Sequence, residues 1–143
     1  MRKLKFIDLF CGCGGFSLGF KKAGFEHIFG LDNNQDACEV YEKNIGKSIC
    51  MNIEDFNGKE YNRKIDVLIG SPPCQKMSYA NFQNRDVKLG MNLVRQFMRV
   101  VDEIKPKVWI WENVKGIFKN MDKINRDKKQ QHNYHHLYKK ENP

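Results

Sequence analysis

Short apolar runs alternate with amphipathic segments between residues 4 and 114, and this alternation limits the possible folds more than any other feature. A strand that is covered on both faces needs apolar side chains throughout, so the runs are typical of a parallel sheet. Strands are predicted at residues 4–10, 27–32, 48–53, 65–70 and 107–114, and helices at residues 16–25, 34–46 and 92–104. This order predicts an α/β fold, an open and mostly parallel sheet with helices on both faces.

The spacing of apolar residues also predicts which helix faces are buried, because residues three or four positions apart lie on one face. The buried face of the second helix is predicted to consist of Ala37, Val40, Tyr41 and Ile45. That of the third helix is predicted to consist of Leu93, Phe97, Val100, Val101 and Ile104.

Three unusual stretches directly follow predicted strands. They read CGCGGFS at residues 11–17, GSPPCQ at residues 70–75 and WENV at residues 111–114. Ligands of open α/β sheets bind at the carboxyl ends of the strands. Because all three stretches fall at such ends, the sequence predicts a single site along this edge of the sheet.

The first stretch is rich in glycine and favours a nucleoside-type ligand. Gly12 and Gly14 let the backbone approach a ligand closely, and the following helix N-terminus attracts a negative group. The dinucleotide pattern G-x-G-x-x-G fails, because its last position is Ser17. Asp32, at the end of the second strand, can accept hydrogen bonds from ribose hydroxyls. The alternatives are a tight turn for the glycines and a helix cap for Asp32.

The second and third stretches supply a candidate nucleophile and a candidate acid. Two prolines hold Cys74 on a stiff turn at a strand end, and a nucleophile must be positioned before it reacts. The alternative is a buried and inert thiol. Glu112 at the neighbouring strand end is a possible acid. Its alternative is a structural carboxylate paired with a lysine.

The total charge permits a polyanionic partner. The chain has 143 residues, a formal net charge of +8 and a pI near 9.3, and eight basic against three acidic residues lie in the segment 115–143. The five cysteines have no repeated spacing that would suggest disulfides or a metal site, so a cytoplasmic protein with reduced thiols and no metal is expected. No apolar run is long enough to span a membrane.

Taken together, the three stretches resemble the motifs of the cytosine-5 DNA methyltransferases. The segment FIDLFCGCGGFSLGF is similar to their cofactor loop, GSPPCQKMS to their Pro-Cys-Gln motif and WENVKG to their Glu-Asn-Val motif. The resemblance covers residues 4–118 and implies the Rossmann-like fold of S-adenosylmethionine-dependent methyltransferases. Residues 1–118 are then the catalytic and cofactor-binding domain, and residues 119–143 are expected to be a disordered, basic polar tail.

The resemblance also implies roles for individual residues. Cys74 would attack C6 of a flipped-out cytosine in DNA, Glu112 would hold or protonate N3, and C5 would then accept the methyl group. Asn52 and Ile53 would lie beside the adenine, Pro73 would fix Cys74, and residues 76–90 would form a loop that closes over DNA, with Lys76, Arg85 and Lys88 as possible phosphate contacts. The residues expected to line or support the S-adenosylmethionine pocket are Phe10, Gly12, Gly14, Asp32, Asn52, Ile53, Pro73 and Leu93.

Some features depart from the family pattern. Asn52 stands where the family usually has aspartate, so weaker cofactor binding is expected. No counterpart of the Gln-x-Arg-x-Arg motif or the target-recognition domain follows Val114. We therefore expect a truncated or split enzyme whose sheet is incomplete at its C-terminal side and whose activity needs a complementing chain. The alternatives are an RNA (tRNA) cytosine-5 methyltransferase and an inactive module that binds cofactor or nucleic acid.

Overall fold

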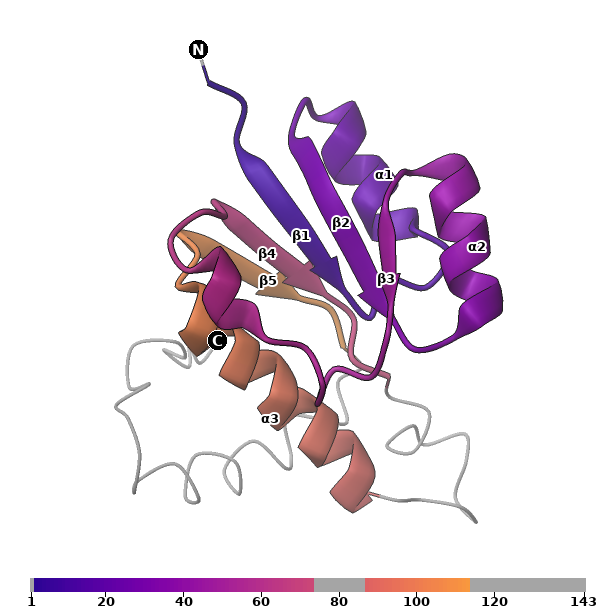
Figure 1. The fold of residues 1–143 in the computed structure, drawn as a ribbon, viewed down its shortest axis with the longest axis vertical. Helices are drawn as coiled ribbons and strands as arrows, with labels where there is room; N and C mark the ends of the chain where they lie inside the picture. Colours follow the sequence, from indigo (N-terminus) through magenta and orange to yellow (C-terminus); the bar gives the residue numbers. More distant parts are fainter. Residues whose placement is uncertain (1, 74–86, 114–143) are drawn as a thin grey trace, which may run out of the picture.

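The computed structural model describes residues 2–73 and 87–113, with side chains from residue 92 onward in the second range. In this part of the chain, five strands form one parallel sheet in the order β3-β2-β1-β4-β5 (Figure 1). The strands are β1 Lys5–Leu9, β2 Glu26–Asp32, β3 Ser48–Cys50, β4 Val67–Gly70 and β5 Val108–Trp111. The helices are α1 Gly15–Lys22, α2 Gln35–Asn44, α3 Val87–Ile104 and the 3-10 helix η1 Gly58–Tyr61. The predicted α/β fold is confirmed.

The direction in which the chain adds strands reverses at β1. From β1 the chain moves outward through β2 to β3, and it then returns to the other side of β1 to form β4 and β5. β1 is therefore paired with both β2 and β4. A reversal of this kind opens a crevice at the carboxyl ends of the two strands that meet there, and ligands of open sheets bind in such a crevice.

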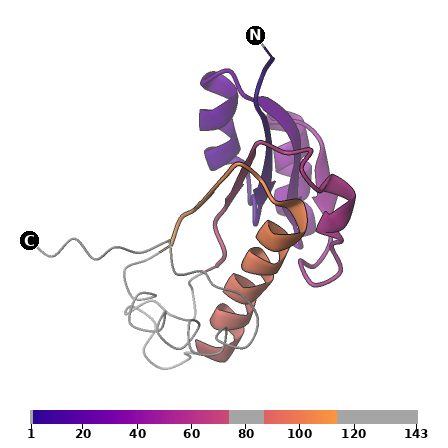
Figure 2. The same ribbon diagram turned by 90° about the vertical axis from the view of Figure 1, so that its left-hand side faces the viewer.

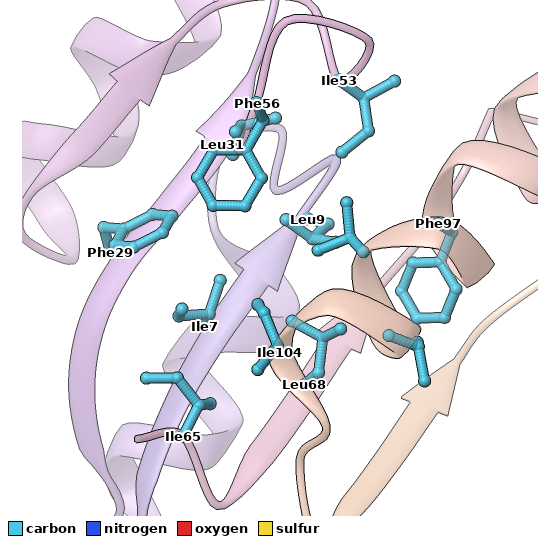
Figure 3. Packing of buried hydrophobic residues seen from close by; sticks show 12 residues of the cluster. Ile7, Leu9, Phe29, Leu31, Ile53, Phe56, Ile65, Leu68, Phe97 and Ile104 are labelled. Atoms are coloured by element: carbon cyan, nitrogen blue, oxygen red, sulfur yellow. The ribbon is translucent and has the colours of Figure 1, made fainter. Parts of the chain in front are cut away.

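Alternate residues of the strands face two different helical layers (Figure 2). Phe6 packs toward α1, where Phe16 and Phe20 cover it, whereas Ile7 and Leu9 lie in the cluster that α3 completes. Figure 3 shows side chains of the larger cluster packed between the sheet and α3. Its buried members are Ile7, Leu9, Phe29, Leu31, Ile53, Phe56, Ile65, Leu68, Phe97, Val100, Val101 and Ile104. Burying each large side chain contributes about 1.5–3 kcal/mol, so this cluster supplies most of the apolar stabilisation of the described residues.

An apolar groove of 530 Å³ lies between α1 and the side of the sheet that ends in β5. Val108 and Ile110 of β5 are 52% and 41% exposed there. The groove is lined by Leu4, Gly15, Phe16, Gly19, Phe20, Ala23, Phe25, Val67, Val108 and Ile110. Among the described residues, none of the helices has the length and apolar character needed to cross a membrane.

Two details of the predicted helices are wrong. α3 begins at Val87 rather than at Asn92, so it includes the last residues of the predicted loop 76–90; Gly90 is tolerated inside the helix. On α2, Val40 is 39% exposed, while Cys38 is buried with Tyr41 and Ile45. Tyr41 and Ile45 are thus buried as predicted, but Cys38 rather than Val40 completes the buried face. The short helix η1 was not predicted.

Candidate active site

The loop between β1 and α1 has an unusual backbone. Phe10, Gly12 and Gly14 all have positive φ, at 57°, 50° and 93°. The loop is held by a bond from the Cys11 amide to the carbonyl of Leu31 on β2, at 3.0 Å. A non-glycine residue in the left-handed region is uncommon and strained, and such strain gathers at functional sites. Phe10 therefore marks the end of β1 as a candidate site.

The two glycines that were expected to touch a ligand have different reasons to be glycine. A Cβ on Gly14 would lie 2.4 Å from Ile45 Cγ1, so this residue is required for packing α1 against α2. A Cβ on Gly12 would meet no atom within 4 Å. The loop therefore leaves open space beside Gly12. The positive φ of this residue is a conformation that only glycine adopts easily.

Asp32 ties the loop to the end of β2. Its Oδ2 accepts a hydrogen bond from the Gly12 amide at 2.9 Å, and its Oδ1 accepts one from the Asn34 amide at 3.0 Å. The N-cap of α2 is Asn34, whose Oδ1 accepts from the Ala37 amide at 2.9 Å, so the interpretation of Asp32 as the cap is wrong. Each carboxylate oxygen of Asp32 retains a further lone pair that can accept from a ligand hydroxyl.

Just after β3, the polar side chain of Asn52 is exposed. Its Oδ1 accepts a hydrogen bond from Asn33 Nδ2 at 3.1 Å. Ile53 is only 3% exposed, because its side chain belongs to the core beneath α3. Of these two neighbours, it is therefore Asn52 that presents a side chain to this edge of the sheet.

The ends of β4 and β5 lie side by side. The Glu112 amide donates to the carbonyl of Gly70 at 3.0 Å, and Asn113 Nδ2 donates to the carbonyl of Pro72 at 3.0 Å. Glu112 and Pro73 are exposed. No lysine or arginine within residues 2–73 and 92–113 forms an ion pair with Glu112, so its interpretation as a structural partner of a lysine gains no support there.

The other predicted site residues have different outcomes. Leu93 is half-buried, packs against the core cluster and lies in the second turn of α3 instead of at its start. Cys74, Lys76 and Arg85 lie outside the described residues. Lys88 falls on the first turn of α3. The structure thus brings together the strand-end residues from β1 to β5 and the segment that immediately precedes Cys74.

A buried polar network beneath the glycine loop was missed by the sequence analysis. The Ser17 hydroxyl donates to Asp8 Oδ2 at 2.7 Å and lies 2.6 Å from the Tyr41 hydroxyl, which in turn lies 2.8 Å from His27 Nε2. Burial disfavours the charged form and raises the pKa of Asp8 to about 6. Asp8 Oδ1 has no hydrogen-bond partner among the described residues. The only signal in the sequence was a charged residue inside the apolar run FIDLF.

The two buried cysteines of the described residues are poor nucleophiles. Burial, together with the nearby carboxylates of Asp8 and Asp32, raises the pKa of Cys11 far above its usual range. Burial is also the main reason that the pKa of Cys38 rises to about 11. Because the thiolate is the reactive form, neither residue attacks a substrate near neutral pH. Within the described residues, no group of three or more histidine, cysteine or acidic side chains is placed to hold a metal ion.

The family model for C-5 cytosine-specific DNA methylase matches residues 4–139. The chain belongs to this family. The type II methyltransferase M.HindV of Haemophilus influenzae is 42% identical over 123 residues, which are 82% of this chain and 40% of that protein. The resemblance inferred from the three strand-end motifs is therefore confirmed.

Solved structures agree with this assignment. A DNA modification methyltransferase encoded within an E. coli prophage has a TM-score of 0.73 and 29% identity, over 90% of this methylase chain and 38% of its own. A SAM-dependent methyltransferase from Archaeoglobus fulgidus has a TM-score of 0.50 and 16% identity, over 73% and 41% of the two chains, and shows the fold alone. This chain spans less than half the length of each of these proteins.

Proposed function

We propose that this chain carries the cofactor-binding and catalytic part of an enzyme that methylates C5 of cytosine in DNA. The observation that carries the proposal is the meeting of three elements at one edge of the sheet. These are the strained glycine loop after β1, the segment 71–73 after β4 and Glu112 after β5. Family membership supports this chemistry for this arrangement.

The residues at the ends of β1, β2 and β3 fit S-adenosylmethionine, the cofactor that the family and fold imply. Gly12 leaves open space beside the loop, Asp32 retains acceptor capacity for ribose hydroxyls, and Asn52 offers an exposed amide for the adenine. Phe10, at the strained end of β1, would contact the adenine ring system of the cofactor. When bound, this cofactor supplies the electrophilic methyl group.

The chain's own catalytic groups act on the cytosine ring. The Cys74 thiolate would form a bond to C6, and the electron pair released from the C5–C6 double bond would make C5 nucleophilic. Glu112 would place a proton at N3 and so neutralise the charge that the ring gains. Once C5 carries the methyl group, the C5 proton would pass to a base such as water, and its bonding pair would re-form the C5–C6 double bond as the Cys74 thiolate leaves. The N3 proton would return to Glu112, which restores the aromatic ring.

The stiff backbone before Cys74 supports this assignment. Pro72 is buried and its carbonyl accepts from Asn113, so the segment 71–73 after β4 is tied to the segment that follows β5. A fixed relation between nucleophile and acid removes much of the entropic cost of the first step. The target base must leave the duplex to reach this edge, since its ring atoms are otherwise inaccessible in the stack.

DNA and a complementing chain are the proposed partners. The net charge of +8 favours contact with phosphates. The relatives are more than twice as long as this chain, and we propose a complementing polypeptide that takes part in target recognition. The test uses the 143-residue chain, alone and mixed with the part of M.HindV that it does not span.

The substrate is duplex DNA in which 5-fluorodeoxycytidine replaces every deoxycytidine, incubated with S-adenosylmethionine. Fluorine at C5 cannot leave as a proton does, so the adduct with the nucleophile accumulates and survives denaturing gels. We expect the adduct with the wild type and with Cys11→Ser, and its loss with Cys74→Ser. An adduct that survives Cys74→Ser would refute the assignment, and a preference for RNA carrying 5-fluorocytidine would favour the RNA alternative.

A further inference from the structure

The turn that carries Asn52 is held from outside by α3. Residues 52–56 connect β3 to η1 through two overlapping turns, with bonds from the Asp55 amide to the Asn52 carbonyl at 3.1 Å and from the Phe56 amide to the Ile53 carbonyl at 3.3 Å. These bonds shape the turn but do not fix its orientation relative to the sheet. Ile53 and Phe56 anchor it by burying their side chains in the core.

Arg99 of α3 fixes the carbonyls of the same turn. Its Nη2 donates to the Ile53 carbonyl at 2.7 Å, and its Nη1 donates to the Phe56 carbonyl at 3.1 Å. The guanidinium is itself held by Glu103 Oε1 and by Gln96 Oε1, each at 2.7 Å. Because the guanidinium is planar and its donors are rigidly spaced, it fixes direction as well as distance.

Glu103 extends the clamp to the next element. Its Oε2 accepts a hydrogen bond from the Gly58 amide at 2.9 Å, at the start of η1. A Cβ on Gly58 would lie 3.0 Å from this oxygen, so the backbone approaches α3 closely at this point. One face of α3 therefore holds the whole connection from Ile53 to Gly58 by polar contacts.

We propose that Arg99 is a positioning residue that sets the orientation of Asn52 and thereby the recognition of the adenine base. The Arg99 guanidinium is engaged by the carbonyls of the turn and by Glu103 and Gln96, so it acts through the turn. The inference rests on the proposed function, because it requires that Asn52 faces the adenine of S-adenosylmethionine. Loss of the clamp leaves the turn anchored by Ile53 and Phe56 but free to change the direction of the Asn52 amide.

The test compares the affinity of each variant for two ligands. They are S-adenosylhomocysteine and its analogue S-inosylhomocysteine, which has a 6-oxo group in place of the 6-amino group. Both dissociation constants are measured by calorimetric titration of the full chain. The ratio of the constant for S-inosylhomocysteine to that for S-adenosylhomocysteine reports recognition of the base edge. The matched control is Arg2→Met, which removes a guanidinium that donates to Asp66 at 2.8 Å at the opposite, amino end of the strands.

We expect Arg99→Met to weaken binding of S-adenosylhomocysteine about tenfold and to bring the ratio close to one, because the hydrogen bond between the Asn52 amide and the adenine would be lost. Arg99→Lys keeps the charge beside Glu103 but cannot serve both carbonyls in one geometry, so it should show a smaller loss of the same kind. This variant decides the question if Arg99→Met does not fold. Arg2→Met should leave the ratio unchanged.

An unchanged ratio in folded Arg99→Met, or in Arg99→Lys when Arg99→Met does not fold, would overturn the positioning role and leave the proposed function standing. A ratio that falls equally in Arg2→Met would also overturn it, because the effect would then be one of general stability. A wild-type chain that binds neither ligand would overturn the proposed cofactor site, and the role of Arg99 with it.

Discussion

Asp8 places a carboxyl group inside the molecule, where its charge is costly. The pKa of Asp8 is raised to about 6, chiefly by burial, so the folded state binds the proton more tightly than the unfolded state does. A raised pKa means that the contribution of Asp8 to stability is full below the unfolded pKa near 4. It is then lost as the pH rises to about 6. The neutral isostere asparagine has no such dependence.

We therefore predict that Asp8→Asn gains stability relative to the wild type as the pH is raised. The difference in unfolding free energy between the two proteins should move by about 2 kcal/mol in favour of the variant between pH 4 and pH 7. Urea denaturation at both pH values measures it. Asp55→Asn, which removes an exposed carboxylate, is the control. A difference that stays constant with pH would contradict the prediction.

Gly14 and Gly15 are neighbours in the same glycine cluster but should respond differently to alanine. At Gly14 a Cβ would come within 2.4 Å of Ile45 Cγ1 and φ is 93°, so Gly14→Ala should cost about 1–3 kcal/mol or more. At Gly15, the first residue of α1, a Cβ meets nothing within 4 Å, so Gly15→Ala should be neutral or stabilise by about 1 kcal/mol. Chemical denaturation of the two variants tests this contrast.

The location of several candidate site residues could be predicted, because these residues lie at or just after the ends of strands in the sequence. Gly12, Asp32 and Glu112 all lie at the predicted edge. Arg99 could not be predicted in the same way, because its partners are backbone carbonyls 43 and 46 residues away. Every residue has a backbone carbonyl, so no pattern of side chains in the sequence predicts such a contact.

At the level of elements, Asp66 joins the amino ends of three strands. Its carboxylate accepts from the Lys5 amide at 2.9 Å and pairs with Arg2 and with Lys107, each at 2.8 Å. The hydrogen bond from Lys107, followed by that from the Lys5 amide, lowers the pKa of Asp66 to about 2. A lowered pKa gives stability that is present above the unfolded pKa near 4 and is lost as the pH falls toward 2.

We predict that Asp66→Asn destabilises the protein by about 1–3 kcal/mol at pH 7, because hydrogen bonds to a charged group are lost. The difference from the wild type should shrink as the pH is lowered from 4 to 2. Thermal or urea unfolding across this range measures the effect, with Asp55→Asn, an exposed carboxylate, as the control. An unfolding difference that grows at low pH would contradict it.

The strands and helices could largely be predicted, because the apolar runs are buried on both faces and leave little ambiguity. The start of α3 could not, because glycine is disfavoured inside a helix and Gly90 lies only three residues after the first residue of α3. The buried face of α2 was misplaced because Cys38 was not counted among the apolar residues, although free cysteine is often buried. The helix η1 has only four residues and no apolar period to reveal it.

At the scale of the whole molecule, the groove beside β5 exposes apolar side chains to solvent. We predict that the purified chain binds the dye ANS there, because the lining is almost wholly apolar. The double variant Val108→Thr, Ile110→Thr should lose most of the dye fluorescence while threonine preserves strand propensity. Leu18→Gln is the control, since Leu18 is 42% exposed but lies outside the groove. Equal losses in both proteins would contradict the prediction.

The order of strands in the sheet has a consequence for how the protein is made. β1 lies at the centre of the sheet, but its neighbour β4 comes much later in the sequence. The Lys5 amide, for example, donates a hydrogen bond to the Asp66 carboxylate although 61 residues separate the two. On the ribosome, β1 can pair with β2 early, but its other edge stays open until β4 leaves the exit tunnel. Contacts between distant parts of a chain form slowly, and an open strand edge invites pairing with other chains. The interval between the emergence of β2 and that of β4 is therefore when the nascent polypeptide most needs a chaperone.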